Sequence, residues 1–174
     1  MNSRNLLSCL AAVLAAFCVA ATANGAAIWV GVGSYGNNSI LIYDTNGNQT
    51  GGFTTAGTDG IYGMTLVGNQ VWVDNGSGGI TRYDQSGTSL GTITGDTFSC
   101  TTVIGNQAWA YGSNGYIYRY SFGGALLGQV AVQVPIYGLT QVGNVVWAGE
   151  RTNATGYGVG VYDLNGNYLY GFLQ

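Results

Sequence analysis

The sequence of 174 residues contains no histidine, a single proline and few charges, with four basic and seven acidic residues. Without histidine, a Ser-His-Asp triad, a Cys-His pair and a histidine-containing zinc site are excluded, because the usual proton shuttle near neutral pH is missing. The basic residues are all arginines, and only Arg82, Arg119 and Arg151 lie beyond the N-terminal region. Three scattered guanidinium groups cannot neutralise a phosphate backbone, so nucleic acid is not expected as a partner.

The first 23 residues have the features of a signal peptide. Arg4 precedes an almost wholly apolar run over residues 6–20, and Ala21-Thr22-Ala23 presents the small residues that a signal peptidase accepts. The run is shorter than the roughly 20 residues of a membrane-spanning helix, so cleavage after Ala23 is predicted and an uncleaved anchor is the alternative. We therefore expect a signal peptide over 1–23, a single domain over 24–174, and an extracellular or periplasmic location.

Cysteine is too scarce for a disulfide framework. Cys9 and Cys18 leave with the predicted signal peptide, so Cys100 remains alone and the exported fold must be stabilised by packing. No base or cation lies near Cys100 in the sequence to lower its pKa. It is therefore expected to be a small buried residue and not a nucleophile.

The sequence does contain a repeat of about 40 residues, marked by four tryptophans. After each tryptophan come a tyrosine, a glycine, and then a large apolar residue. The four positions are occupied by Trp29, Trp72, Trp109 and Trp147; Tyr43, Tyr83, Tyr120 and Tyr162; Gly47, Gly87, Gly124 and Gly166; Phe53, Ile93, Val130 and Phe172. Four kinds of residue do not recur in the same order by chance, so the repeat is the strongest indication of the fold in this sequence.

Each repeat predicts four short antiparallel strands, rich in β-branched and aromatic residues and joined by Gly, Asn, Asp and Ser turns. The units span 28–53, 61–93, 98–130 and 136–172. Such units are typical of β-propeller blades, so the predicted fold is an all-β propeller of about four blades. The first unit lacks its inner strand, which leaves fifteen strands. The chain is then an incomplete ring, a piece of a longer propeller, or a ring closed by oligomerisation, and open strand edges favour self-association.

The pattern of an apolar strand, Gly-Asn, Trp, Tyr-Asp-x-x-Gly and a final apolar residue resembles the NHL-like propeller repeats of secreted bacterial proteins. Some of these carry a PEP-CTERM sorting tail. The resemblance covers residues 24–174 and implies a superfamily, not an activity. No Pro-Glu-Pro motif precedes Gln174, so sorting by that route is not supported.

Two repeated features could bind ligands but have structural interpretations as well. The tryptophan row could stack on sugars, although its mid-strand position favours packing between blades. The Tyr-Asp-x-x-Gly turns resemble oxygen-rich Ca²⁺ loops, yet each has a single carboxylate and ordinary hairpin chemistry. No cofactor is predicted, with Ca²⁺ at these turns as the alternative.

Four residues outside the repeat pattern are the candidate ligand contacts. Asp74 and Glu150 each follow a tryptophan strand, and loops on one propeller face could bring them, or Asp59 and Asp96, into one cleft for acid-base hydrolysis. Arg82 and Arg119 share one repeat position, so a carboxylate or sulfate could bridge them; solvated strand ends or a pair with a nearby Asp are the alternatives.

These observations favour a non-enzymatic, secreted binding or protein-interaction module for a glycan or protein ligand, without catalytic residues or a metal site. The alternative is a propeller hydrolase, lactonase-like, with a metal in the central channel. A surface fibre or matrix protein is a third possibility, because Gly, Asn and Tyr with little charge suit stacked β-assemblies.

Overall fold

The structure is a computed structural model that describes residues 18–21, 27–34, 37–55, 60–132, 134–151 and 156–173. These residues form sixteen strands in four antiparallel sheets and one short 3-10 helix, η1 (Gly76–Gly78). No helix in this part of the chain has the length and apolarity that a membrane span needs.

Each sheet is one repeat of the sequence and is called a blade, numbered along the chain. Blade 1 contains β1 (Cys18–Ala21), β2 (Ile28–Ser34), β3 (Asn37–Tyr43) and β4 (Gln49–Thr54). Blade 2 contains β5 (Gly63–Val67), β6 (Gln70–Asp74), β7 (Ile80–Asp84) and β8 (Ser89–Ile93). Blade 3 contains β9 (Phe98–Ile104), β10 (Gln107–Gly112), β11 (Tyr116–Tyr120) and β12 (Leu126–Ala131). Blade 4 contains β13 (Ile136–Val142), β14 (Val145–Arg151), β15 (Tyr157–Asp163) and β16 (Tyr168–Leu173).

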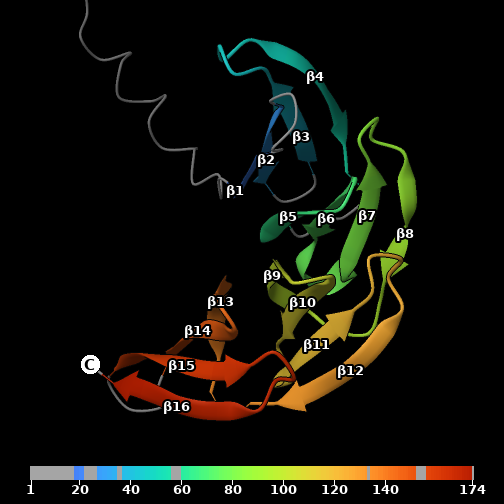
Figure 1. Cartoon of the computed structure of the whole chain (residues 1–174). Coiled ribbons are helices and arrows are strands. Elements are labelled where there is room, and N and C mark those ends of the chain that lie inside the picture. Colours follow the sequence, from blue (N-terminus) through green and yellow to red (C-terminus); the bar gives the residue numbers. More distant parts are fainter. Residues whose placement is uncertain are drawn as a thin grey trace, which may run out of the picture.

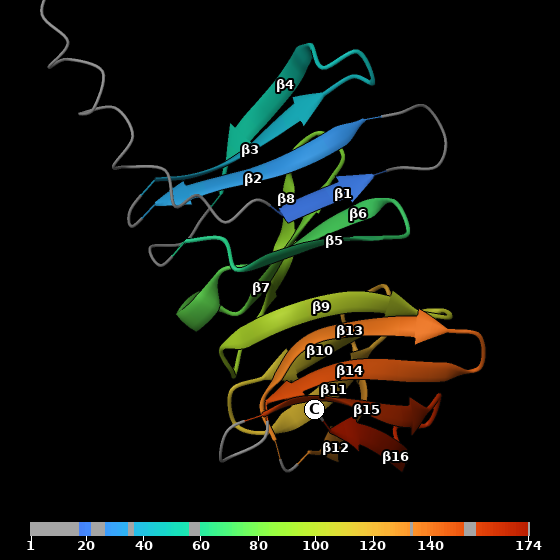
Figure 2. The same cartoon turned by 90° about the vertical axis from the view of Figure 1, so that its left-hand side faces the viewer.

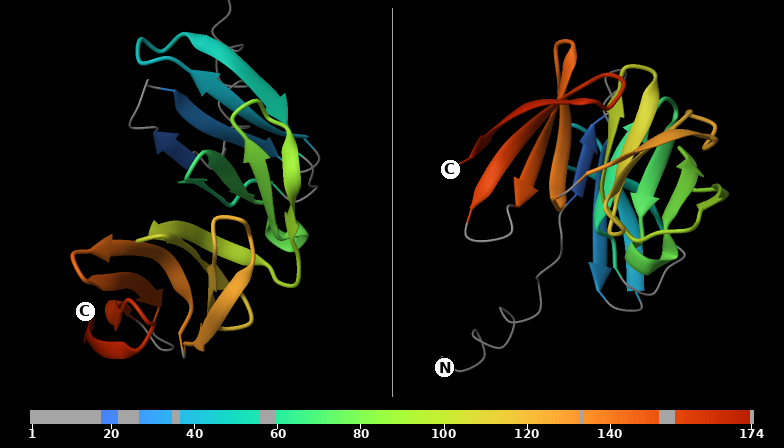
Figure 3. Two further views of the ribbon diagram at one scale, coloured as in Figure 1. Left: turned by 45° about the vertical axis from the view of Figure 1, so that its right-hand side comes forward. Right: turned by 90° about the horizontal axis from the view of Figure 1, so that it is seen from below.

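The four blades are arranged as an open arc around the inner strands (Figure 1). Inner strands of successive blades are in contact, β1 with β5, β5 with β9 and β9 with β13, as the view into the open side shows (Figure 2). The fourth strands, β4, β8, β12 and β16, lie on the outer rim (Figure 1). Blades 1 and 4 form the two ends of the arc (Figure 3, left). The prediction of an all-β propeller with about four blades and an unclosed ring is confirmed.

The predicted absence of an inner strand from blade 1 is wrong. Cys18–Ala21 pairs antiparallel with β2, from Cys18 opposite Gly31 to Ala21 opposite Ile28, and brings the strand count from fifteen to sixteen. Small apolar residues occur both in signal peptides and in edge strands. Because residues 18–21 were interpreted as part of a signal peptide, their pairing with β2 was not predicted. Cleavage after Ala23 stays a prediction, and it would remove β1.

The turn between the third and fourth strands has the same backbone hydrogen bonds in every blade. In blade 1 the Asp44 carboxylate accepts hydrogen bonds from the backbone N–H groups of Asn46 and Asn48, at 2.9 and 2.8 Å. The N–H of Gly47 donates to the Asp44 carbonyl at 3.1 Å, and Gly47 has φ +82°. A left-handed backbone favours glycine, which explains why the glycine recurs in every unit.

Packing between blades forms the core, and each interface contains one of the repeated tryptophans. Trp29 packs against Val71, Val73 and Tyr83 of blade 2. Trp72 packs among the blade 3 residues Ala108, Ala110 and Tyr120, and Trp109 among the blade 4 residues Val146, Ala148 and Tyr162. Both faces of an inner blade are therefore covered, which explains why the strands are apolar on both sides.

Candidate functional site

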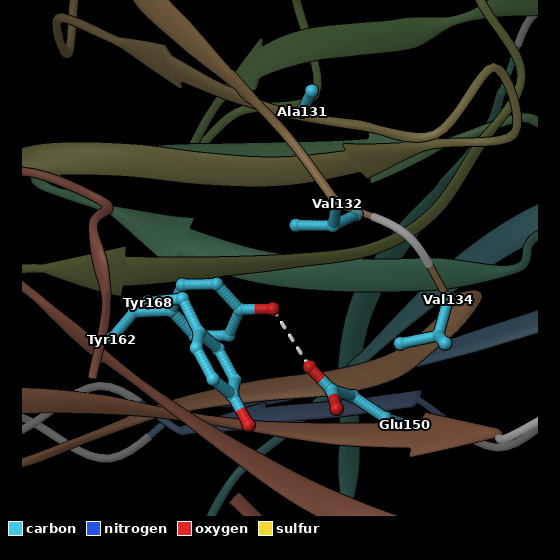
Figure 4. A pocket seen from close by; sticks show the side chains of 6 residues that line it. All are labelled: Ala131, Val132, Val134, Glu150, Tyr162 and Tyr168. Carbon is cyan, nitrogen blue, oxygen red and sulfur yellow. Dashed lines mark hydrogen bonds between the residues drawn. The ribbon is translucent and has the colours of Figure 1, made fainter. Parts of the chain in front are cut away.

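A cavity of about 390 Å³ lies between blades 3 and 4 and contains one of the four candidate ligand contacts, Glu150 (Figure 4). Its apolar wall comes from Ala131 at the end of β12 and from Val132 and Val134 in the segment that follows. Blade 4 supplies the polar groups, Glu150 of β14, Tyr162 of β15 and Tyr168 of β16. We refer to this cavity as the Glu150 pocket.

The phenol of Tyr162 holds the Glu150 carboxylate in place. The Tyr162 hydroxyl donates a hydrogen bond of 2.7 Å to Oε1 of Glu150, which is only 9% exposed. The carboxylate lies over Gly160, where an added Cβ would come within 2.1 Å of Oε1. Glycine at position 160 therefore makes room for the carboxylate beside a buried strand.

Burial, together with the hydrogen bond to Glu150, raises the pKa of Tyr162 far above its usual range. The phenol therefore stays protonated at physiological pH and can donate its hydrogen bond to Glu150. A fixed carboxylate beside apolar walls can accept hydrogen bonds from a ligand's hydroxyl or N–H groups. Glu150 is the only acidic residue among the described residues that line the pocket. The pair of carboxylates that glycoside hydrolysis needs is therefore not formed by these residues.

The sequence interpretation did not find the aromatic partners of Glu150. Tyr162 was assigned to the structural repeat, and Tyr168 had no assignment, although its ring lies edge-on to that of Tyr162 with centroids 5.4 Å apart. Tyr168 is 58% exposed and stands beside the carboxylate (Figure 4). One signal was available in the sequence, since Gly160 stands between two valines of β15.

Asp74 lies elsewhere, at the end of β6. It is 1% exposed, and its Oδ1 accepts a hydrogen bond from the Gly76 N–H at 3.0 Å, while Oδ2 has no hydrogen-bond partner among the described residues. Burial raises the pKa of Asp74 to about 7. Asp74 and Glu150 belong to blades 2 and 4, and Asp74 does not line the Glu150 pocket. Of this predicted pair, Glu150 alone is among the described residues that line the Glu150 pocket.

Cys100 of β9 lies near Asp74. Burial raises the pKa of the Cys100 thiol to about 12, and the negative charge of Asp74 adds to this shift. A thiol that stays protonated is a poor nucleophile, and Cys100 is half-buried, where the sequence predicted a buried residue.

The two loop acids have different outcomes. Asp96 accepts hydrogen bonds from the Thr97 N–H at 2.7 Å and from the Ser113 hydroxyl at 3.1 Å, so it ties the loop before β9 to the end of β10. It lines a separate, smaller cavity with Phe98 and Tyr118. Asp59 lies outside the described residues.

The two arginines are each held by contacts of their own. Arg82 donates hydrogen bonds to the backbone carbonyl of Leu90, at 2.9 Å, and to that of Gly123 in blade 3. Arg119 lies over the ring of Trp109, with its guanidinium carbon 5.9 Å from the ring centroid. Arg82 therefore links blades 2 and 3 through backbone carbonyls, and Arg119 makes a cation-π contact within blade 3.

The turn carboxylates are engaged by their own loops. Hydrogen bonds from Asn48 lower the pKa of Asp44, and hydrogen bonds from Ser86 and Asn167 lower those of Asp84 and Asp163. In blade 3 the Ser121 hydroxyl replaces the carboxylate and accepts the Ala125 N–H. Within the described ranges, no group of three or more Asp, Glu or Cys side chains has the arrangement of a metal site.

Comparison with known proteins supports the fold. No protein-family model matches the chain, and no curated protein matches it either. BamB from Moraxella catarrhalis has a TM-score of 0.65 and 14% identity, with 88% of this chain and 51% of BamB covered. The computationally designed protein Ika4 has a TM-score of 0.66 and 16% identity, with 86% and 92% covered. The designed Ika8 has a TM-score of 0.65 and 16% identity, with 88% and 48% covered.

The chain thus spans about half the length of BamB and Ika8, and nearly all of Ika4. These structures are β-propeller proteins, and at such low identity the likeness concerns the fold alone. By its architecture and by these likenesses, the chain is a β-propeller protein.

Proposed function

We propose that this chain is a secreted, non-enzymatic binding module of the NHL-like propeller type, and that it binds a glycan or a protein segment at the Glu150 pocket. The observation that carries the proposal is the hydrogen bond of 2.7 Å from Tyr162 to Glu150, which fixes one acceptor carboxylate at the base of an apolar pocket. Fixed polar groups in an apolar cavity are typical of ligand sites.

The exposed ring of Tyr168 adds a second type of contact. An aromatic face beside a carboxylate can cover the apolar face of a sugar or an aliphatic side chain, while the carboxylate accepts hydrogen bonds from hydroxyl or N–H groups. The pocket therefore suits a ligand that has both polar donors and an apolar surface.

Calorimetric titration with a panel of neutral oligosaccharides and short peptides tests this proposal. For a probe that binds, Glu150→Gln and Tyr168→Ala should each weaken affinity by about tenfold or more, because each removes one contact of the pocket. Tyr157→Ala is the matched control, since Tyr157 is an exposed tyrosine of the same blade that does not line the pocket. Binding that is unchanged in both pocket variants would contradict the proposal.

The alternative function is a metal-dependent hydrolase. The residue that supports this alternative is Asp74. Its buried Oδ2 has no hydrogen-bond partner in the described part of the chain, which is a feature of functional sites as well as of structural ones. Turnover of chromogenic esters and lactones, with and without added divalent metal, tests it. Metal-dependent turnover that is lost in Asp74→Asn would favour the hydrolase, and no turnover is expected.

Secretion is supported by the signal-like residues 1–23. Expression in a bacterium with intact export, followed by N-terminal sequencing of the exported chain, should give a mature N-terminus at Asn24. A chain that begins at Met1 and stays in the cell would contradict this part of the proposal.

A further inference from the structure

One face of blade 4 has the composition of a blade interface but no blade against it. The tryptophans of blades 1 to 3 are 0–2% exposed, whereas Trp147 of blade 4 is 37% exposed. Nine of the thirteen exposed large hydrophobic side chains in the described residues belong to blade 4 or its turns. Strand pairing places Trp147, Tyr170 and Phe172 among them on this one face. Concentrated exposed apolar side chains of this kind mark an interaction surface.

The contact that this face lacks can be identified from the interface between blades 1 and 2. There Trp29 and Phe53 are 5.9 Å apart, and Tyr83 of blade 2 packs on Phe53 at 5.0 Å. In blade 4 the equivalent pair, Trp147 and Phe172, lies at a similar 6.3 Å. A hollow of about 310 Å³ opens beside Trp147. The pair is therefore built to receive a tyrosine in the position of Tyr83.

The opposite end of the arc presents that tyrosine. Tyr43 is the residue of blade 1 equivalent to Tyr83, and its pairing opposite Ile28 matches that of Tyr83 opposite Val71. Strand alternation places Tyr43 on the face of blade 1 away from blade 2, because Trp29 and Ile40 occupy the other face.

The repeated turn glycines also identify blade 1 as an end of the arc that no other blade covers. An added Cβ at Gly87 would lie 2.5 Å from Phe53 of blade 1, and at Gly166 it would lie 2.4 Å from Val130 of blade 3. At Gly124 it would meet Arg82 of blade 2 at 2.8 Å. At Gly47 of blade 1, nothing described lies within 4 Å. Each turn glycine is thus covered by the preceding blade except the one in blade 1.

From these matched faces we propose that two copies of this chain close one ring, head to tail. The Trp147 and Phe172 face of each copy packs on the Tyr43 and Gly47 face of the other, as Trp29 and Phe53 pack on Tyr83 and Gly87 within the chain. Both junctions are then equivalent, and a head-to-tail contact that closes gives a ring and not a filament. The lengths of BamB and Ika8 agree with this, because this chain covers about half of each. Self-association through open strand edges was expected from the sequence. The complementary surfaces are instead the outer faces of blades 1 and 4.

Light scattering on a sizing column tests the pairing and should give twice the mass of one chain. Phe172→Asp and Tyr43→Asp, at opposite ends of the arc, should each weaken pairing at least tenfold, because each places a charge in both junctions. Leu127→Asp is the matched control, since Leu127 of β12 is 51% exposed and Phe172 of β16 is 53% exposed. Far-UV circular dichroism confirms that each variant is folded, and Tyr43→Ser is a milder variant of the same face.

Mixing the two variants makes the test specific for head-to-tail contact. A mixed pair has one junction with both faces intact, so the mixture should form pairs at concentrations at which either variant alone is monomeric. The proposal is overturned by an unchanged chain that is monomeric, by a mass larger than two chains, or by a mixture that stays monomeric. Titration of the Glu150 pocket is a separate measurement, because neither Phe172 nor Tyr43 lines that pocket.

Discussion

Trp109 and Trp147 occupy the same position in adjacent blades, yet one is fully buried and the other is 37% exposed. Their own sheets are alike, with four antiparallel strands and the tryptophan in the second. The difference comes from the next blade, which covers Trp109 with Val146, Ala148 and Tyr162 and has no counterpart for Trp147. A repeat residue therefore has an energetic role that depends on its neighbour in the ring, and not only on its own strand.

The largest expected effect is the difference between these two tryptophans. Trp109→Ala should lower the free energy of unfolding by about 4 kcal/mol, because it leaves a cavity in the interface between blades 3 and 4. Trp147→Ala should cost about 1 kcal/mol at concentrations at which the chain is monomeric, because its ring is already partly solvated. Urea unfolding measures both values. Equal losses would show that blade 4 is stabilised in the same way as the inner blades.

The turn glycines of blades 1 and 2 differ in the same way as the two tryptophans, because only one of them is covered by another blade. Gly87→Ala should cost about 3 kcal/mol, because the left-handed backbone is strained and the new methyl group displaces Phe53. Gly47→Ala has the same backbone strain and open space around it, so about 1 kcal/mol is expected for the monomeric chain. A Gly47→Ala cost as large as that of Gly87→Ala would contradict the assignment of blade 1 as an uncovered end.

Buried and exposed carboxylates should respond to pH in opposite directions. The folded-state pKa of Asp74, about 7, is above its ordinary value of 3.8. As pH rises from about 4 to about 7, ionisation of Asp74 therefore lowers the free energy of unfolding. Above pH 7 this loss does not grow further. Asp74→Asn should raise the free energy of unfolding by about 2 kcal/mol at pH 8 and change it little at pH 4.

Asp163→Asn is the comparison for this pH experiment. Hydrogen bonds from Asn167 lower the pKa of Asp163, so its contribution is present above the ordinary pKa and is lost as pH falls. As pH rises, the unchanged chain should therefore become more stable relative to Asp163→Asn. Relative to Asp74→Asn, the unchanged chain should become less stable as pH rises. Chemical unfolding from pH 3 to pH 8 distinguishes the two signs.

The smallest effect is expected at the Glu150 pocket. Tyr162→Phe removes the donor to a buried carboxylate and should cost about 1 kcal/mol, while Tyr168→Phe, on an exposed ring, should cost close to nothing. The loss from Tyr162→Phe should shrink in a Glu150→Ala background, because the carboxylate is then absent. A loss that is the same in both backgrounds would mean that the hydrogen bond does not contribute to stability.

Much of the fold could be predicted from the sequence because its signals are local. The Tyr-Asp-x-x-Gly turn depends on residues within five positions, and it forms as expected in blades 1, 2 and 4. The Glu150 site could not be predicted in this way. Its partner Tyr162 lies on another strand, and Gly160 has meaning only once β14 and β15 are paired.

Local sequence specifies the repeat, the four-stranded blade and the apolar character of both blade faces, because turn chemistry and strand alternation operate over a few residues. Packing between distant segments sets the rest: Cys18–Ala21 pairs with β2, Asp74 does not line the Glu150 pocket, and Trp147 is left exposed. Each of these outcomes depends on which surface packs against a residue, and that surface comes from segments far away in the chain.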